Sequence, residues 1–175
     1  MIDMNDSKVF LGEFCFRVAG ILMNKRRILL QTDDLVDFWV IPGGGVKLFE
    51  SSEQAIKREF QEEMKLKVEV DRLLWIVENS FIFDNTKLHG IEFTFLVKPL
   101  NEISGFNQRE FHGIENDITV PTESIYKEHE DLKLTFRWFK PEELDSITIK
   151  PDIYTNELKN IPSHAKLIRN LEITE

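Results

Sequence analysis

The sequence predicts an α/β fold in which helices cover a mixed β-sheet. Two observations indicate this class: short apolar segments rich in Val, Ile, Leu and Phe recur along the chain, and one strongly amphipathic segment lies among them. Strands on both sides of a central helix, followed by helical segments, are typical of a sheet packed against helices. At 175 residues the chain has the size of one domain, so residues 1–175 are predicted to form a single unit.

The first strands lie near the N-terminus. Residues 14–23 (FCFRVAGILM) and 26–31 (RRILLQ) are apolar and are joined by a polar turn at Asn24 and Lys25. The next short apolar segment, FWVI, ends at Pro42 and predicts a third strand. Later segments with strand character are residues 68–78, 81–83, 91–97 and 132–139.

The amphipathic segment predicts a helix that begins after Ser51 and ends near Met64. Ser51 and Gln54 have the spacing of a capping box, which satisfies the first backbone N–H groups of a helix. Ile56, Phe60 and Met64 recur at the spacing of a buried helical face. The helix should therefore pack one face on the sheet.

Two later regions are less regular. Residues 101–131 are polar and weakly periodic, which indicates a long connection of the kind that is usually functional or mobile. Pro141 is suited to the first position of a short helical turn. C-terminal helices are predicted at about 152–171, in two segments, 152–158 and 163–171.

Charge and composition exclude some functions. The net charge of −9 disfavours a nucleic-acid binder or an anionic-membrane binder that uses a basic surface. No N-terminal signal segment and no apolar run of membrane-spanning length occurs, so a cytoplasmic location is expected. The single cysteine, Cys15, excludes an internal disulfide.

The glutamates behind the glycine run Gly43 to Gly45 carry the strongest functional signal. On a helix that advances about 100° per residue, Glu59, Glu62 and Glu63 project within one arc. Like charges at these spacings cost about 0.2–0.5 kcal/mol per pair, a penalty that a divalent cation among them would offset. Ligands that offer only oxygen favour Mg2+, Mn2+ or Ca2+ over zinc.

This region resembles the Nudix box, a family motif with glycine, glutamate, Arg-Glu and Glu-Glu at fixed spacing. The residues that match it in register are Gly44, Glu50, Arg58, Glu59, Phe60, Glu62, Glu63 and Leu66, while Lys65 replaces the final glycine. The flanking segments FWVIPGGG and RWFKPEEL also resemble family members. The resemblance implies a Nudix-type α/β/α sandwich with a mixed β-sheet.

The resemblance also implies an activity and a set of site residues. Nudix enzymes use Mg2+, with Mn2+ a plausible substitute, to hydrolyse a phosphoanhydride bond in a nucleoside diphosphate linked to another moiety. Glu59, Glu62 and Glu63 are then the metal-binding and catalytic carboxylates, joined by the Gly43 carbonyl as a metal ligand. The backbone of Gly43, Gly44 and Gly45 would approach the substrate, and Arg58 would pair with Glu50 to shape the site.

The general base stays open between two positions. Glu59 is the candidate in the box, and Glu128 and Glu130 are candidates in a later loop, where Glu130 is also predicted to bind substrate. His89 with Glu92, and separately His112 and His129, are further candidates for substrate contact, but a structural role is the preferred interpretation for each histidine. An aromatic residue is expected to stack a base, with Phe81, Phe83, Phe106, Phe111 and Trp138 as candidates.

Two other functions compete with hydrolysis. A Nudix-like domain that only binds or senses nucleotides usually has lost box carboxylates, whereas all are present here. An isomerase acting on isopentenyl diphosphate needs a reactive cysteine, and the apolar surroundings of Cys15 do not favour one. The substrate is expected to be a small nucleotide, and a homodimer is possible.

Overall fold

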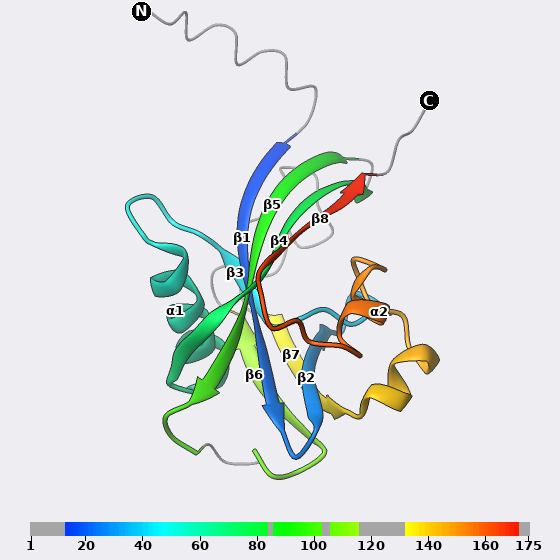
Figure 1. The fold of residues 1–175 in the computed structure, drawn as a ribbon. Coiled ribbons are helices and arrows are strands. Elements are labelled where there is room, and N and C mark those ends of the chain that lie inside the picture. Colours follow the sequence, from blue (N-terminus) through cyan, green and yellow to red (C-terminus); the bar gives the residue numbers. More distant parts are fainter. Residues whose placement is uncertain (1–12, 84–85, 103–105, 116–131, 172–175) are drawn as a thin grey trace, which may run out of the picture.

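The computed structural model describes residues 13–83, 86–102, 106–115 and 132–171. Its centre is an eight-stranded sheet in the order β6-β7-β2-β1-β5-β4-β8, with β3 paired to β1 (Figure 1). The strands are β1 (Glu13–Asn24), β2 (Arg27–Asp33), β3 (Gly43–Gly45), β4 (Val68–Phe83), β5 (Thr86–Pro99), β6 (Glu110–Glu115), β7 (Leu132–Phe139) and β8 (Lys166–Leu171).

Strand β1 joins the two parts of the sheet. Residues 13–22 pair in parallel with β5, whereas Met23 and Asn24 pair with β2 in an antiparallel hairpin. Strand β3 pairs antiparallel with β1 through Arg17–Gly45, Val18–Gly44 and Ala19–Gly43. Parallel and antiparallel pairs together confirm the predicted mixed sheet.

Helix α1 (Ser52–Met64) begins and ends as the sequence predicts. The Ser51 hydroxyl accepts from the Gln54 backbone, and the Gln54 side chain accepts from the Ser51 backbone, which is the predicted capping box. Ile56, Phe60 and Met64 are buried, as their spacing predicts. The helix stops at Lys65, which adopts the left-handed conformation with φ 58° and ψ 23°.

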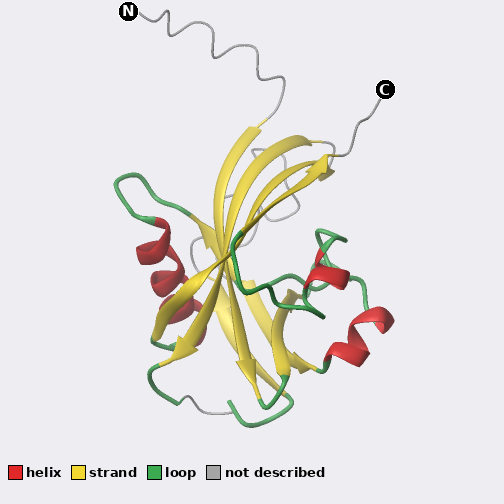
Figure 2. Cartoon of the chain, in the orientation of Figure 1, coloured by secondary structure: helices red, strands yellow, loops and turns green. Residues whose placement is uncertain are grey.

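Helices lie on both sides of the sheet, so the predicted α/β fold is confirmed with few and mostly short helices (Figure 2). Helix α1 packs on one side in a cluster with Val18, Phe95 and Phe136. The other side is covered by the 3-10 helix η2 (Pro141–Ser146), predicted at Pro141, and by α2 (Tyr154–Glu157). None of the helices in the described ranges is long and apolar enough to span a membrane.

Three predicted elements were wrong. Residues 163–171 were predicted to be helical, but Lys166–Leu171 forms β8, which pairs in parallel with β4 and covers its edge. The connection at 101–131 contains β6, and residues 116–131 lie outside the described part of the chain. The FWVI segment makes only isolated bridges, Gln31 with Val40 and Trp39 with Ile149, and the strand that pairs with β2 over most of its length is β7.

Candidate active site

The glycines of β3 allow close approach on both sides. A Cβ on Gly43, whose φ is +154°, would lie 2.0 Å from the Val18 carbonyl oxygen. A Cβ on Gly44 would lie 2.5 Å from the Glu59 carboxylate. Only glycine fits at position 43, and a side chain at position 44 would have to displace the Glu59 carboxylate, so β3 brings backbone directly against the carboxylate side of α1.

Arg58 joins the loop after β3 to the helix. Its Nε and Nη2 donate to the two Glu50 oxygens at 2.8 and 2.9 Å, and Nη2 also donates to the Gly45 carbonyl at 2.8 Å. Its Nη1 donates to Glu59 at 2.7 Å and to Glu62 at 3.0 Å. We call Arg58, Glu50 and Glu62 the Arg58 brace; the predicted pairing of Arg58 with Glu50 is present.

The brace consists of mutually satisfied charges. The hydrogen bond from Arg58 holds the pKa of Glu50 below its usual value, and the hydrogen bond to Glu50 raises the pKa of Arg58. A bidentate arginine–carboxylate pair fixes orientation as well as distance. The brace therefore holds the loop in place without a free charge.

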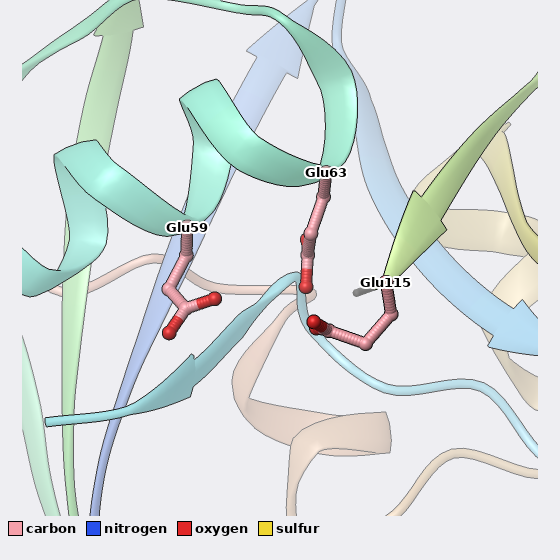
Figure 3. A group of neighbouring side chains, drawn as sticks. All are labelled: Glu59, Glu63 and Glu115. Atoms are coloured by element: carbon pink, nitrogen blue, oxygen red, sulfur yellow. The ribbon is translucent and has the colours of Figure 1, made fainter. Parts of the chain in front are cut away.

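A second group of carboxylates lies deeper. One oxygen each of Glu59, Glu63 and Glu115 lies within 4.8 Å of the other two, and we call these residues the carboxylate cluster. Figure 3 shows Glu59 and Glu63 extending from α1 on the same side, while Glu115 reaches toward Glu63 from β6. Glu59 and Glu63 are 5% and 3% exposed, so two acidic groups are buried beside a third.

Of the three carboxylates, Glu63 has the environment that most disfavours a negative charge. In the described residues no N–H or hydroxyl group donates to its oxygens, and the Glu115 carboxyl lies close enough to share a hydrogen bond with it. Burial, followed by the charges of Glu59 and Glu115, raises the pKa of Glu63 well above its usual value. Burial also raises the pKa of Glu59, against the opposing charge of Arg58. A buried carboxylate without donors is costly unless a cation pairs with it.

The cluster fits a hard divalent cation. All its donors are carboxylate oxygens, which Mg2+, Mn2+ and Ca2+ prefer. The unsatisfied oxygens of Glu63 supply the reason that a cation would be held here rather than at an exposed acidic patch. Glu62 lies outside the cluster, because its carboxylate is 45% exposed and accepts from Arg58.

Glu115 was not among the predicted site residues. It reaches the cluster because β6 approaches α1 closely at Gly113, where a Cβ would lie 2.2 Å from the Glu63 carbonyl oxygen. Phe111, Gly113 and Glu115 alternate along β6, so they share the face turned toward the helix. This alternation was the available signal, and it was obscured by the polar character of residues 101–131.

The other candidate substrate contacts that the structure describes, which lie outside α1 and β3, are not part of the carboxylate cluster. Phe106, Phe111 and Trp138 are buried in the core, which disfavours them as residues that stack a base. Phe81 is half-buried on β4 and stays a candidate, while the side chain of Phe83 lies outside the described part of the structure. His89 and His112 are exposed on β5 and β6 and contact Ser80 and Thr135. Glu92 accepts from Tyr154. The residues that lie outside the described part of the chain are Glu128, His129 and Glu130.

Known proteins share this fold and this sequence pattern. A family model for the NUDIX domain matches residues 14–160. Diphosphoinositol polyphosphate phosphohydrolase 2 of Rattus norvegicus is 30% identical over 94 residues, which are 53% of this chain and 52% of that protein. The chain thus spans about half the length of this curated relative.

Two solved structures have a similar fold. A MutT mutator protein from Bacillus halodurans has a TM-score of 0.58 at 18% identity, with 89% of each chain covered. An ADP-ribose pyrophosphatase from Streptococcus suis has a TM-score of 0.53 at 16% identity, with 89% of this chain and 98% of that chain covered. The match to the family model over most of the sequence shows that the chain belongs to the Nudix hydrolase family.

Proposed function

We propose that the protein hydrolyses a phosphoanhydride bond, with Mg2+ or Mn2+, in a nucleoside diphosphate linked to another moiety. The carboxylate cluster carries this proposal, because Glu63 is buried beside Glu59 and Glu115 and no N–H or hydroxyl group in the described residues donates to it. The names of two relatives agree on the type of bond. One is a phosphohydrolase of diphosphoinositol polyphosphate and the other a pyrophosphatase of ADP-ribose.

Each site residue has a defined role in the proposal. Glu59, Glu63 and Glu115 would hold the cation, with the Gly43 carbonyl as a further ligand. A bound divalent cation supplies charge neutralisation at the diphosphate and a lowered pKa of bound water. The backbone of Gly43, Gly44 and Gly45 approaches the diphosphate, since glycine leaves room for its oxygens.

Neighbouring side chains would accept the proton and hold the site residues in position. Glu59 is the proposed general base, because its carboxylate lies in the cluster, within reach of a water that the cation would hold. Arg58 fixes one Glu59 oxygen and, through Glu50 and Gly45, the loop beside it. Glu62 acts through Arg58, and Glu130 is kept as the alternative base and substrate contact.

The charge of the protein makes the cation important for substrate binding. A net charge of −9 weakens the long-range attraction of any polyanion, so a cation at the carboxylate cluster would supply the local attraction for a diphosphate. A domain that only senses nucleotides is disfavoured because Glu59, Glu62 and Glu63 are all present.

A substrate panel tests the proposal. Release of nucleoside monophosphate or phosphate is measured with Mg2+ for ADP-ribose, nucleotide sugars, dinucleoside polyphosphates, oxidised nucleoside triphosphates and a diphosphoinositol polyphosphate. Wild type should turn over at least one nucleotide. Glu63→Gln should lower turnover about a thousandfold, since metal charge stabilisation contributes several kcal/mol.

The matched control is Glu53→Gln, which makes the same chemical change at an exposed position of α1. It should retain wild-type turnover. Nucleotide binding without release by the wild type would instead establish the sensory function. Release from the inositol compound alone would replace the nucleotide as substrate.

A further inference from the structure

A second arginine lies beside the site with its donors unused. Arg17 is on β1, where its Cα pairs with Gly45 of β3 on one side and with Glu92 of β5 on the other. Gly45 in turn accepts a hydrogen bond from Arg58 through its carbonyl. The glycine strand therefore has one arginine on the helix side and another at its paired strand.

The two arginines differ in how their guanidinium groups are used. Arg58 makes five hydrogen bonds to protein atoms. Among the described residues Arg17 has one ion pair, Nε to Glu92 Oε2 at 3.8 Å, and no side-chain hydrogen bond. Its side chain is 44% exposed. A guanidinium with free donors presents the planar fork that binds phosphate in a bidentate way.

Glu92 is held so that it can orient Arg17. The Tyr154 hydroxyl donates to Glu92 Oε1 at 2.5 Å, and the Thr94 hydroxyl lies 2.7 Å from the Tyr154 oxygen. Tyr154 and Thr94 are 1% and 0% exposed. The network therefore fixes one oxygen of Glu92 and leaves the other, Oε2, toward Arg17.

Strand β3 also connects Arg17 to the carboxylate cluster. Gly45, which pairs with Arg17, follows Gly44, and a Cβ on Gly44 would lie 2.5 Å from the Glu59 carboxylate. Arg17 is therefore paired with the glycine strand along which the diphosphate is proposed to lie. An anion bridging Arg17 and the cluster would meet carboxylate-held metal at one end and a guanidinium at the other.

We propose that Arg17 binds a phosphate group of the substrate diphosphate, and that Glu92, fixed by Tyr154 and Thr94, is its positioning residue. This inference rests on the proposed hydrolysis. It identifies a phosphate of the diphosphate as a group that a side chain of the protein, and not only the cation, would bind. The buried network also connects α2, which carries Tyr154, to the substrate site. Tyr154 would thus influence binding through Glu92 without touching substrate.

The test uses imidodiphosphate, which has the diphosphate shape and a bridging nitrogen, titrated calorimetrically into the full chain with Mg2+. Arg17→Gln should weaken imidodiphosphate binding about 10- to 100-fold, since hydrogen bonds to charged groups contribute about 1.5–3 kcal/mol. Arg17→Lys should recover part of this loss, because lysine keeps the charge and loses the fork. The matched control, Arg169→Gln, removes an exposed arginine that pairs with Glu78 and should bind as wild type.

Positioning is tested separately with Tyr154→Phe, which keeps the ring and removes the hydroxyl. For the nucleotide that the wild type hydrolyses in the substrate panel, Tyr154→Phe should raise KM severalfold with kcat nearly unchanged. A purely structural role of Tyr154 would lower thermal stability and leave this KM as it is. Equal imidodiphosphate affinity in wild type and Arg17→Gln, or no imidodiphosphate binding by the wild type, would overturn the inference. Mg2+ uptake by the same proteins without imidodiphosphate reports on the proposed function alone, so the two failures are distinguishable.

Discussion

The Arg58 brace and the carboxylate cluster both include residues of α1, and the carboxylates of the two groups have opposite environments. In the brace, Glu50 and Glu62 each accept from Arg58, and the pKa of Glu50 is lowered mainly by its hydrogen bond to Arg58. In the cluster, no N–H or hydroxyl group among the described residues donates to Glu63, and burial raises its pKa. Neighbouring glutamates in one motif thus have opposite environments.

This difference separates stabilising residues from binding residues. Charges that are satisfied within the protein hold the loop and helix together and have little capacity left for a ligand. Charges that are buried unsatisfied lower the stability of the folded protein, and a ligand that binds only the folded state recovers it. The comparison therefore predicts that metal stabilises the protein through the cluster and leaves the brace unchanged.

The largest effect on folding is expected from the brace. Arg58→Ala leaves Glu50 and Glu59 without their shared donor and should lower the free energy of unfolding by about 2–3 kcal/mol, less than for a fully buried pair because Arg58 and Glu50 are half-buried. Arg58→Lys, which keeps the charge, should cost less. Denaturant unfolding at neutral pH measures both. Equal stability of wild type and Arg58→Ala would show that the brace contributes nothing to the fold.

The two groups should also respond to pH in different windows. Glu63 has a raised pKa, so above pH 4.5 the unfolded chain loses a proton that the folded chain keeps. The stability of the metal-free protein should therefore fall as pH rises through the range between 4.5 and the folded pKa, by at most about 1.4 kcal/mol per unit for this group. Glu50 has a lowered pKa, so its contribution is lost only as pH falls below 4.5.

Thermal unfolding of wild type and Glu63→Gln in chelator, at several pH values, resolves this effect. The variant should gain stability relative to wild type as pH rises above 4.5, because the glutamine has no charge to bury. Parallel pH curves for the two proteins would contradict the assignment of Glu63 as an unsatisfied buried acid.

A smaller effect is expected where β6 meets the helix. Gly113→Ala places a Cβ against the Glu63 carbonyl oxygen, so β6 must move away from α1 and carry Glu115 with it. Divalent-metal affinity should fall about tenfold, which is the size of loss found when residues that position metal ligands are changed. Calorimetric titration with Mn2+ measures it, with His112→Ala on the opposite face of β6 as the control. Unchanged affinity in Gly113→Ala would remove Glu115 from the proposed ligands.

The smallest effect concerns the helix end. Lys65 has a φ of 58°, which costs a residue other than glycine about 1 kcal/mol. Lys65→Gly relieves this strain but loses the hydrogen bond from Lys65 Nζ to the Glu62 carbonyl at 3.0 Å. The net gain in stability should be under about 1 kcal/mol, with turnover unchanged. A lowered melting temperature would show that the side-chain contact outweighs the backbone strain.

The local pattern was sufficient for α1. The capping box at Ser51 and the buried face depend on residues close in sequence, whose spacing a helix converts directly into direction. The Arg58–Glu50 pair was predicted from the resemblance to the Nudix box, since Glu50 lies in the loop before the helix. The argument from helical spacing also grouped Glu62 with Glu59 and Glu63. It could not show that Arg58 would hold Glu62 at the surface, because that depends on how competing side chains pair.

Long-range pairing accounts for what the sequence did not predict. Glu115 joins the cluster only because β6 pairs with β7 and approaches α1 at Gly113. Residues 166–171 form a strand because the edge of β4 is available to them, and their own pattern does not distinguish strand from helix. Residues Phe106 and Trp138 are core residues for the same reason, since their partners are distant in sequence.

Uptake of Mg2+ or Mn2+ by the metal-free protein, measured calorimetrically, is the most direct test of the cluster as the metal site. The account predicts binding by the wild type, loss of about a hundredfold or more in affinity for Glu63→Gln, and a change of about tenfold or less for Glu62→Gln, in keeping with the several kcal/mol at stake for an uncompensated buried charge. Absence of uptake by the wild type, or wild-type affinity in Glu63→Gln, would contradict it.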